Sequence, residues 1–437
     1  MESREKTPTF NIRVVLQETG IKPHTLRAWE RRYGLPQPER TSGGHRLYSQ
    51  HDIEIIKWLM ARQDEGLSIS RAVDLWFTLE DEGEDPLATY HAEEQPIFSE
   101  AGITLTKVRD QWISKCLDFD EAGAESVLVQ AFALYPIKTV CLEVLLAGAA
   151  HIGELWHQNK VTVQQEHFVS ALVSKRLNAL LAALPGPNRS GRILLAAPPN
   201  EVHDIPLLLL TVLLRYSGFK VVHLGANVPV VDLESTVDFI KPDLVVLGAQ
   251  RLATASTLFD VAKFLQQKNV RVGYGGRPFN QNPSLRQHIP AHFLGDNLEL
   301  GVQNILQIMT FNPPLPEVKP VPDTYKLLLS RYRLQRSHIN LDAWQTLADE
   351  GIQQSFIFAA NEGLSAAIEA ALNLGDLSPV NNEILWALQL IQNHDMPEDW
   401  LPGYLDAYRQ AVDKHLKGSS PISHCLEQVI EDLQETV

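Results

Sequence analysis

The chain is poor in cysteine and lacks a long uninterrupted apolar run, and both absences narrow its class. Its three cysteines, Cys116, Cys141 and Cys425, lie far apart in 437 residues. Sparse, widely spaced thiols favour a reducing compartment over a disulfide framework. Without a run of about 18 apolar residues we expect no transmembrane helix and no membrane partner. The first residues do not resemble a signal peptide, so we expect a soluble, cytoplasmic protein.

Patterns typical of common enzymes are also missing. The sequence has no P-loop, no Ser/His/Asp order of a nucleophilic triad and no zinc-ligand spacing, so we expect no enzyme. The net charge of −15 does not indicate a nucleic-acid partner, but the charge is unevenly distributed. Between Lys22 and Arg46 there are six Lys or Arg residues against two Glu. This basic segment is where we expect contact with nucleic acid.

Residues 8–78 have the pattern of a winged helix-turn-helix. A Gly-containing turn at residues 19–21 separates a short helix from a basic one, which is typical of this motif. A hairpin-like wing over residues 34–48 is expected to turn at residues 42–44. The three expected helices are Phe10–Gln17, Lys22–Tyr33 and Asp52–Ala61.

This segment resembles the DNA-binding domain of MerR-family regulators. The pattern T-x-R-x-W-E-R-R-Y-G-L occurs at residues 25–35, and G-G-x-R-x-Y occurs at residues 43–48. The resemblance implies that the second helix and the wing contact double-stranded operator DNA, and that the chain acts as a homo-oligomer, a dimer or a tetramer. The implied DNA-binding residues are Thr25, Arg27, Arg31, Arg32, Tyr33, His45, Arg46 and Tyr48.

Residues 79–103 are acidic and have the composition of an extended linker. In residues 104–187, four segments carry apolar residues at i, i+3 and i+4 spacing, which is the pattern of amphipathic helices. Short connections between these segments predict a four-helix bundle. The segments are Val108–Leu117, Phe119–Phe132, Ile137–Asn159 and Val163–Leu184.

Residues 188–311 alternate between short apolar runs and helical stretches. This alternation predicts a Rossmann-like domain whose parallel sheet has the flavodoxin-like order. The expected strands are Ile193–Ala197, Val221–Leu224, Leu244–Leu247, Val270–Tyr274 and His292–Leu294. Ligands of such sheets lie at the carboxyl ends of the strands, and His203 is on the loop after the first strand. Glycines that would let a backbone approach a ligand follow the other strands: Gly225, Gly248, Gly275, Gly276 and Gly295.

The bundle resembles that of light-sensing, adenosylcobalamin-binding MerR regulators of the CarH type. It has their W-x9-E-H spacing, with Trp156-His157 near the end of the third helix and Glu166-His167 at the start of the fourth. The resemblance implies that Trp156 shields the adenosyl group of the cofactor, and that Glu166 and His167 hold it. It also implies that His157 becomes the upper axial cobalt ligand after photolysis, a role that suits a neutral imidazole.

The sheet domain resembles a cobalamin-binding domain through Glu201-Val-His203, the L-G-x-x-V-P pattern at residues 224–229 and Gly275-Gly276. The resemblance implies that His203 is the lower axial cobalt ligand and that Glu201 or Asp204 binds its other ring nitrogen. The remaining implied cofactor contacts are Gly225, Val228, Pro229, Gly248, Gly275 and Gly276.

The chain departs from this pattern in two places. Pro206 stands where the family has a glycine, and Gly248-Ala249-Gln250 stands where it has S-x-L. Both places normally accommodate the nucleotide tail of cobalamin. Haem or a bilin is therefore the alternative cofactor, and a sensor without a cofactor that responds to a protein partner is a further alternative.

Residues 312–340 begin with a proline-rich stretch and are expected to form a linker. Residues 341–437 are expected to form an all-helical interaction or oligomerisation region, with Trp386 and Trp400 in its core. The expected helices are Ala343–Asn361, Gly363–Leu374, Asn382–Gln392, Leu405–Lys417 and Ile422–Leu433.

The sequence thus predicts a multidomain chain of α and α/β classes. Its expected parts are a winged helix-turn-helix, a four-helix bundle, a flavodoxin-like parallel sheet domain and a C-terminal helical region. The expected function is that of a transcriptional regulator, a repressor, which senses light through adenosylcobalamin. Light would change its oligomeric state and its binding to the operator.

Overall fold

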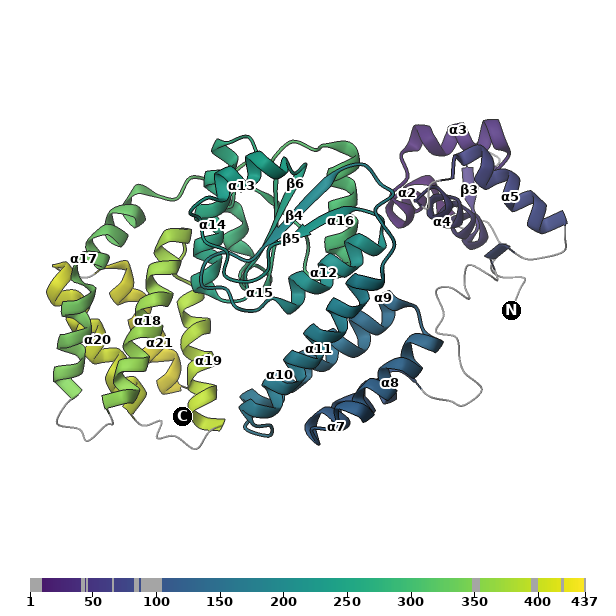
Figure 1. Ribbon diagram of the computed structural model, residues 1–437. Helices are drawn as coiled ribbons and strands as arrows, with labels where there is room; N and C mark the ends of the chain where they lie inside the picture. The colour runs from purple at the N-terminus through teal and green to yellow at the C-terminus, as the bar shows by residue number, and fades with distance from the viewer. Residues whose placement is uncertain are drawn as a thin grey trace. The chain divides into compact units, whose positions relative to one another are not determined.

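A computed structural model describes residues 10–40, 44, 46–64, 67–81, 86–87, 104–347, 354–393, 400–417 and 420–435. The chain divides into two compact units, Met1–Thr104 and Leu105–Val437, which are considered one at a time. Figure 1 shows the elements of each unit in chain order.

The first unit is a small helical domain with a short antiparallel sheet of order β1-β3-β2. Its elements are β1 (Phe10–Asn11), α2 (Ile12–Thr19), α3 (Pro23–Tyr33), β2 (Glu39–Arg40), β3 (Arg46–Tyr48), α4 (Gln50–Asp64) and α5 (Ile69–Asp81). The first helix begins later than expected because Asn11 caps it: the Asn11 side chain accepts hydrogen bonds from the amides of Arg13 and Val14. Gly20 and Gly34 end α2 and α3 in the left-handed conformation.

Helix α5 was missing from the sequence prediction, and it completes the core of this unit. Trp76 of α5 meets Trp58 of α4 edge to face, with ring centroids 5.2 Å apart. The expected turn of the wing at residues 42–44 lies mostly outside the described residues, as does most of the expected linker over residues 79–103.

The second unit begins with the expected helical bundle. Its elements are α7 (Leu105–Leu117), α8 (Glu121–Leu134), α9 (Ile137–Thr139), the π-helical η1 (Val140–Leu146), α10 (Ala147–His157) and α11 (Val163–Ala183). All four predicted helical segments are confirmed, and the third contains the π-helical stretch. Thr162 and Gln165 form a capping box at the start of α11, and Gln165 also donates to the carbonyl of Leu117 at 2.8 Å.

The segment Ile137–His157 is long and apolar enough to cross a membrane by length and composition, although Lys138, Glu143 and Glu154 interrupt it. Part of its apolar surface belongs to the bundle core, where Val140 and Ile152 are fully buried. It is the one helix among the described residues that passes this test.

A five-stranded parallel sheet follows, with strand order β5-β4-β6-β7-β8. This confirms the predicted flavodoxin-like order. Its elements are β4 (Arg192–Ala196), α12 (Ile205–Tyr216), β5 (Lys220–His223), α13 (Leu233–Ile240), β6 (Leu244–Gly248), α14 (Leu252–Gln267), β7 (Val272–Gly275), α15 (Arg277–Gln281), η2 (Pro283–His288), β8 (His292–Phe293) and α16 (Leu298–Phe311).

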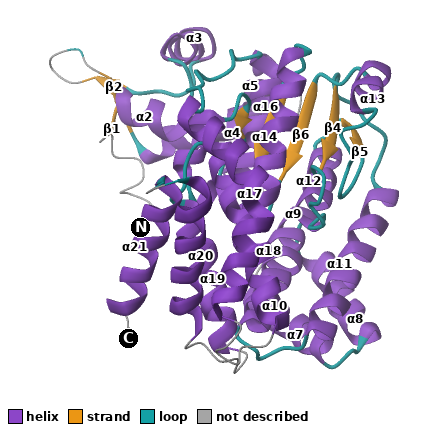
Figure 2. Ribbon diagram, turned by 90° about the vertical axis from the view of Figure 1, so that its left-hand side faces the viewer, coloured by secondary structure: helices purple, strands orange, loops and turns teal. Residues whose placement is uncertain are grey.

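Helices cover both faces of this sheet, as Figure 2 shows. Along β4, Ile193 and Leu195 pack towards α12 and α16, whereas Leu194 packs towards α13 and α14. This alternation follows from the two-residue period of a strand. The carboxyl ends of the strands are left for the loops that carry the candidate site.

The C-terminal region is helical: α17 (Asp323–Leu347), α18 (Gln354–Leu374), α19 (Pro379–Asn393), α20 (Trp400–Leu416) and α21 (Pro421–Glu435). The prediction of a linker over residues 312–340 is wrong beyond Pro322, because α17 begins at Asp323 directly after the last proline of the stretch. The helix predicted over residues 343–361 corresponds to the end of α17 and the start of α18, and the residues between them lie outside the described part of the chain.

Helix α18 joins the C-terminal region to the sheet domain. Ala367, Ala370 and Leu374 of α18 belong to the same buried cluster as α14 and the sheet. Asn373 donates hydrogen bonds to Ser256 at 2.9 Å and to Asp260 at 3.1 Å. Within the second unit, the C-terminal helices are therefore packed on the sheet domain and share its core.

Candidate cofactor site and DNA-binding surface

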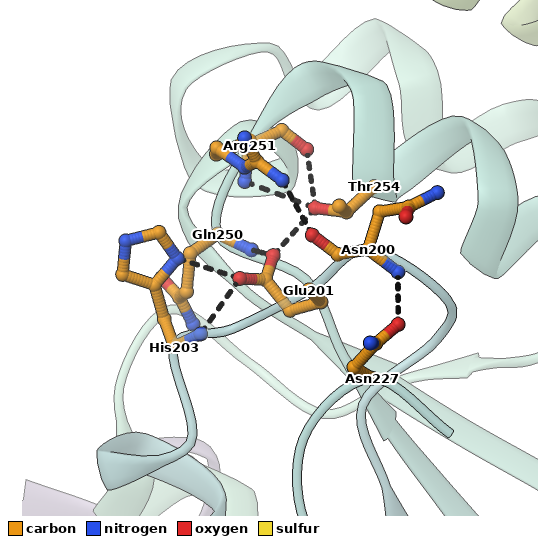
Figure 3. A network of polar contacts seen from close by, with 7 residues as sticks. All are labelled: Asn200, Glu201, His203, Asn227, Gln250, Arg251 and Thr254. Carbon is orange, nitrogen blue, oxygen red and sulfur yellow. Dashed lines mark hydrogen bonds and ion pairs between the residues drawn. The ribbon is translucent and has the colours of Figure 1, made fainter. Parts of the chain in front are cut away.

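Two loops at the carboxyl ends of β4 and β5 are joined by hydrogen bonds. The amide of Asn200 donates to the side-chain oxygen of Asn227 at 2.7 Å, and the amide of Asn227 donates to the carbonyl of Glu201 at 2.8 Å. Both asparagines have positive φ angles, a conformation that asparagine tolerates better than most residues. Figure 3 shows the resulting network, which fixes the position of Glu201.

The carboxylate of Glu201 is fully buried and accepts hydrogen bonds on both oxygens. The Nδ1 atom of His203 lies 2.6 Å from Oε1, and the amide of Gln250 donates to Oε2 at 2.7 Å. Thr254 Oγ1 and the amide of His203 also donate to this carboxylate. Burial alone would raise the pKa of Glu201, but these hydrogen bonds lower it to about 2.

An ionised carboxylate can only accept hydrogen bonds, so it fixes the tautomer of His203. The proton must be on Nδ1, which leaves the lone pair of Nε2 for a ligand. The His203 side chain is 51% exposed, and no hydrogen bond to its Nε2 occurs within the described part of the chain. Metal-ligating histidines usually have such a carboxylate partner, so this imidazole is oriented as a metal ligand would be.

Glu201, and not Asp204, is thus the partner of His203, which decides between the two candidates from the sequence. The carboxylate of Asp204 lies 3.2 Å from Nε2 of His223 instead. The Nδ1 atom of His223 is in turn 3.0 Å from Thr211 Oγ1. Asp204 therefore belongs to a second, separate polar contact at the start of α12.

The glycines after the strands differ in what surrounds them. A Cβ atom added to Gly225 or Gly275 would meet no atom within 4 Å, so the backbone there borders open space. Gly248 lies under Leu207, whose side chain would be 3.0 Å from an added Cβ. The prediction that Gly248 contacts a cofactor is therefore not supported, because the packing of α12 already explains this glycine.

Two further predicted contacts lie on the loop after β5. Val228 is partly buried against the sheet core, whereas Pro229 is exposed. Gly276 has a φ of +134° and no room for a side chain, because an added Cβ would lie 1.8 Å from the carbonyl oxygen of Ala249. Only glycine fits at this position, because any side chain would collide with Ala249 where the backbone passes from β7 to α15.

The second set of predicted cofactor contacts, on the bundle, is at the junction of α10 and α11. Glu166 accepts a hydrogen bond from Ser170 Oγ at 2.7 Å and lies 2.9 Å from Nδ1 of His167. The His167 side chain is 76% exposed. Trp156 is partly buried at the end of α10. These residues belong to the bundle, as expected, and they share the end of the bundle at which α10 ends.

His157 makes a contact that the sequence did not predict. Its ring is stacked on that of Trp386 in α19, with centroids 5.2 Å apart and planes 8° apart. Both ring nitrogens are buried and without a hydrogen-bond partner among the residues described. The expectation that Trp386 is a core residue of the C-terminal region is therefore wrong. Trp400, in contrast, packs against that core.

In the first unit, α3 presents the expected basic residues. Arg27, Arg31 and Arg32 are exposed, whereas Thr25 and Tyr33 are partly buried. Exposed arginines on the second helix of a helix-turn-helix are placed to reach DNA bases or phosphates.

Glu30 of α3 connects this helix to the wing strand β3. It accepts hydrogen bonds from Arg46 Nε at 2.7 Å and from the Tyr48 hydroxyl at 2.6 Å. Tyr48 is fully buried, and burial together with Glu30 raises the pKa of its hydroxyl. The prediction that Tyr48 contacts DNA is therefore wrong: this buried residue orients Glu30, which holds Arg46. His45 lies outside the described residues.

The residues at the sheet edge fit a corrinoid. The imidazole of His203, whose tautomer Glu201 fixes, could provide a lower ligand, and the glycine backbones at Gly225 and Gly275 border open space. The two ring nitrogens of His157 are buried without partners in the described chain, so this imidazole could serve as a second nitrogen donor. Neutral imidazole nitrogen is a suitable donor for a transition-metal ion.

Comparison with known families agrees with this site. Residues 10–75 match the family described as MerR HTH family regulatory protein, and residues 108–181 and 191–295 match two families each described as B12 binding domain. The fold and the site together define a class: a DNA-binding transcriptional regulator with cobalamin-binding domains.

Full-length relatives identify the family more closely. The HTH-type transcriptional repressor CarH of Myxococcus xanthus is 32% identical over 288 residues, which cover 65% of this chain and 94% of the relative. The repressor CarA of the same organism is 32% identical over 292 residues, covering 65% of this chain and 90% of the relative. The chain belongs to this CarH/CarA family of MerR-type, B12-binding regulators.

A solved structure, the monomethylamine corrinoid protein of Methanosarcina barkeri, is similar with a TM-score of 0.42 and 19% identity. The similarity covers 47% of this chain and 100% of that protein. The matched families end at residue 295, before the C-terminal helices.

Proposed function

We propose that the protein is a light-responsive transcriptional repressor that uses adenosylcobalamin as its chromophore. It acts in the cytoplasm as a homo-oligomer, a dimer or a tetramer, and it has no enzymatic activity. The observation that carries this proposal is the imidazole of His203, held at the carboxyl edge of a parallel sheet by the buried carboxylate of Glu201. The winged helix-turn-helix in the same chain would bind the operator DNA.

In this proposal each group of residues has one task. His203 binds cobalt from below, and Glu201 keeps its proton on Nδ1. Trp156, Glu166 and His167 of the bundle hold the upper side of the cofactor. When bound, adenosylcobalamin supplies a cobalt–carbon bond that light can break. His157 then becomes available as the upper nitrogen donor.

Light would act on DNA binding through assembly and not through base contacts. A ligand shifts an equilibrium only by its differential affinity for two states, so the adenosyl form must favour one oligomeric state. Several DNA-binding units in one oligomer bind an operator with higher avidity than one unit does. Loss of the oligomer would lower operator occupancy, while Arg27, Arg31 and Arg32 keep their positions on α3.

The test is an absorption spectrum of the purified full-length protein loaded with adenosylcobalamin, recorded in the dark and after green light, with cobalt and iron analysis. We expect a cobalamin spectrum that illumination changes, together with a change in oligomeric state by size-exclusion chromatography. An iron-containing protein with a Soret band, or a chain that takes up no cobalamin, would overturn the proposal.

Substitution of the lower ligand gives an independent test. His203→Ala should abolish retention of cobalamin on a desalting column, because no other side chain replaces the imidazole at that loop. His151→Ala is the matched control, since this histidine of α10 is also 51% exposed but is paired with Glu154. Equal retention by both variants would show that His203 is not the ligand.

A further inference from the structure

Helix α19 has two different faces. Val380 and Ile384 are buried in the core of the C-terminal helices, and Leu388 packs against that core. Asn382, Trp386 and Asn393 lie on the opposite face, since positions separated by four, seven and eleven residues share one side of a helix. This second face contacts parts of the chain outside the C-terminal region. Figures 1 and 2 both show α19 beside α10 of the bundle.

The N-terminal end of α19 contacts the carboxyl edge of the sheet. Asn382 donates a hydrogen bond to the side chain of Asn282, which follows α15, at 2.9 Å. Glu383 lies within electrostatic range of Arg277 and Arg251, the residues that begin α15 and precede α14. These arginines follow β7 and β6, so the start of α19 lies at the strand ends where the candidate site is.

The carboxyl of Glu383 lies near two arginines at the edge of the sheet. Its side chain is exposed to solvent, yet burial raises its pKa, and the charges of Arg277 and Arg251 oppose that rise. Arg251 also donates to the carbonyl of Asn200, the residue before Glu201.

The other half of α19 contacts the bundle at His157. Trp386 provides the stacked ring, and Asn393 donates a hydrogen bond to the backbone carbonyl of His157 at 2.9 Å. One helix face therefore connects the sheet edge, through Glu383, with the bundle histidine that the family resemblance places above the cofactor.

The imidazole of His157 is poorly compensated in this position. Its two buried nitrogens have no hydrogen-bond partner in the described chain, and leaving buried polar atoms unpaired costs more than a stacked ring pair returns. The stack thus holds a side chain that would gain free energy from any partner able to engage a ring nitrogen. A metal ion in a macrocycle at the sheet edge is such a partner.

We propose that α19 is an additional wall of the cofactor site and that Trp386 is a positioning residue, which holds His157 against α19 until the metal engages it. This inference rests on the proposed function, because it takes a corrinoid to be the ligand. It also gives the C-terminal helices a role in sensing, because their contact with the bundle at α19 would change when the His157 side chain moves.

The contact itself is tested on the full-length protein without cofactor. In protein labelled with 13C at histidine Cε1, the His157 signal, assigned by its loss in His157→Gln, should show an upfield ring-current shift. Trp386→Ala should abolish this shift and Trp386→Phe should retain part of it. Trp400→Ala is the control, since Trp400 contacts Tyr404 and should leave the signal in place. An unchanged signal in Trp386→Ala overturns the proposal.

The coupling is tested by adding hydroxocobalamin. Binding should remove the ring-current shift of the wild type and change hydrogen–deuterium exchange in α19. In Trp386→Ala, coordination of a second imidazole, seen in the absorption spectrum, should be about two to ten times faster, the factor that a lost stacked pair is worth. Trp386→Phe should fall between the two proteins.

The possible failures can be told apart. Suppose the wild type binds hydroxocobalamin, but Trp386→Ala coordinates the second imidazole at the wild-type rate and cofactor binding leaves hydrogen–deuterium exchange in α19 unchanged. The role of α19 is then refuted and the proposed function stands. If the wild type shows the stacked histidine but binds no cobalamin, the proposed function fails, and the wall assignment fails with it.

Discussion

Replacement of Glu201 by glutamine should weaken both the fold of the sheet domain and the binding of the cofactor. The carboxylate accepts hydrogen bonds from four donors on His203, Gln250 and Thr254. A glutamine side chain has nearly the same shape, but an NH2 group replaces one of the two carboxylate oxygens. That group would face donors and not acceptors, so at least one buried pair of hydrogen bonds would be lost.

The size of the effect follows from the pKa of Glu201. This pKa is about 2 in the folded protein against an ordinary value of 4.5, and a difference of roughly 2.5 corresponds to about 3 kcal/mol. The contribution is complete above pH 4.5, because the folded-state value lies below the unfolded one. It is lost as the pH falls from 4.5 towards 2. Glu201→Gln should therefore unfold about 3 kcal/mol more easily at pH 7, by a difference that shrinks in acid.

Two measurements check this prediction. Urea denaturation of the full-length protein, followed by circular dichroism between pH 7 and pH 3, gives the stability difference and its pH dependence. Equilibrium titration with hydroxocobalamin should show about 10- to 100-fold weaker binding, the usual effect of removing the hydrogen-bond acceptor of a metal-ligating histidine. Asp204→Asn is the control, because Asp204 contacts His223 and should leave cofactor affinity nearly unchanged.

The reasoning is refuted if Glu201→Gln keeps the wild-type urea midpoint at pH 7, since a buried carboxylate with four donors could not then be stabilising. A variant that is destabilised but binds hydroxocobalamin with wild-type affinity would separate the two roles. It would leave the network as a structural feature and remove its connection with the metal.

Two other predictions concern the DNA-binding helix and the strand ends. Arg31→Ala should weaken operator binding and, if Arg31 contacts a phosphate, lower the salt slope of log K by about 1 in a mobility-shift titration. Arg71 on α5 is also exposed, and Arg71→Ala should change neither the affinity nor the slope. Gly276→Ala should destabilise the protein by at least about 3 kcal/mol in urea, because of its φ and the nearby Ala249 carbonyl. Gly275→Ala should fold normally and lose cofactor affinity, since its Cβ would enter the open space that the cofactor would occupy. Equal stability of Gly276→Ala and Gly275→Ala would contradict this account.

The predictable part of the fold was local in sequence. The strand order of the sheet and the helices of the bundle follow from alternation and periodicity, which each segment displays without its neighbours. The proline-rich composition that predicts a linker stops at Pro322, and the residues from Asp323 onward have no proline to break a helix until Pro379, so α17 begins at Asp323. Helix α5 lies beyond the three helices of the winged helix-turn-helix pattern, so that pattern does not predict it.

The candidate site was predictable where a motif lies within one loop. Glu201 and His203 are two residues apart, so their contact could be expected from the sequence. The stack between His157 and Trp386 joins segments separated by the whole sheet domain, and no local pattern in a single sequence indicates such a contact. The buried hydroxyl of Tyr48 shows the same limit, because only the fold reveals that Glu30 is opposite it.

A motif match alone does not show why a position requires its residue type, and the glycines at the strand ends illustrate this. Gly248 and Gly275 are both the last residue of a strand, so a sequence pattern treats them alike. The side chain of Leu207 closes the space at Gly248, whereas nothing lies near Gly275. One glycine therefore serves the packing of α12 and the other leaves room at the sheet edge. The space that the fold leaves around a backbone, and not the identity of the residue, separates a structural position from one that can meet a ligand.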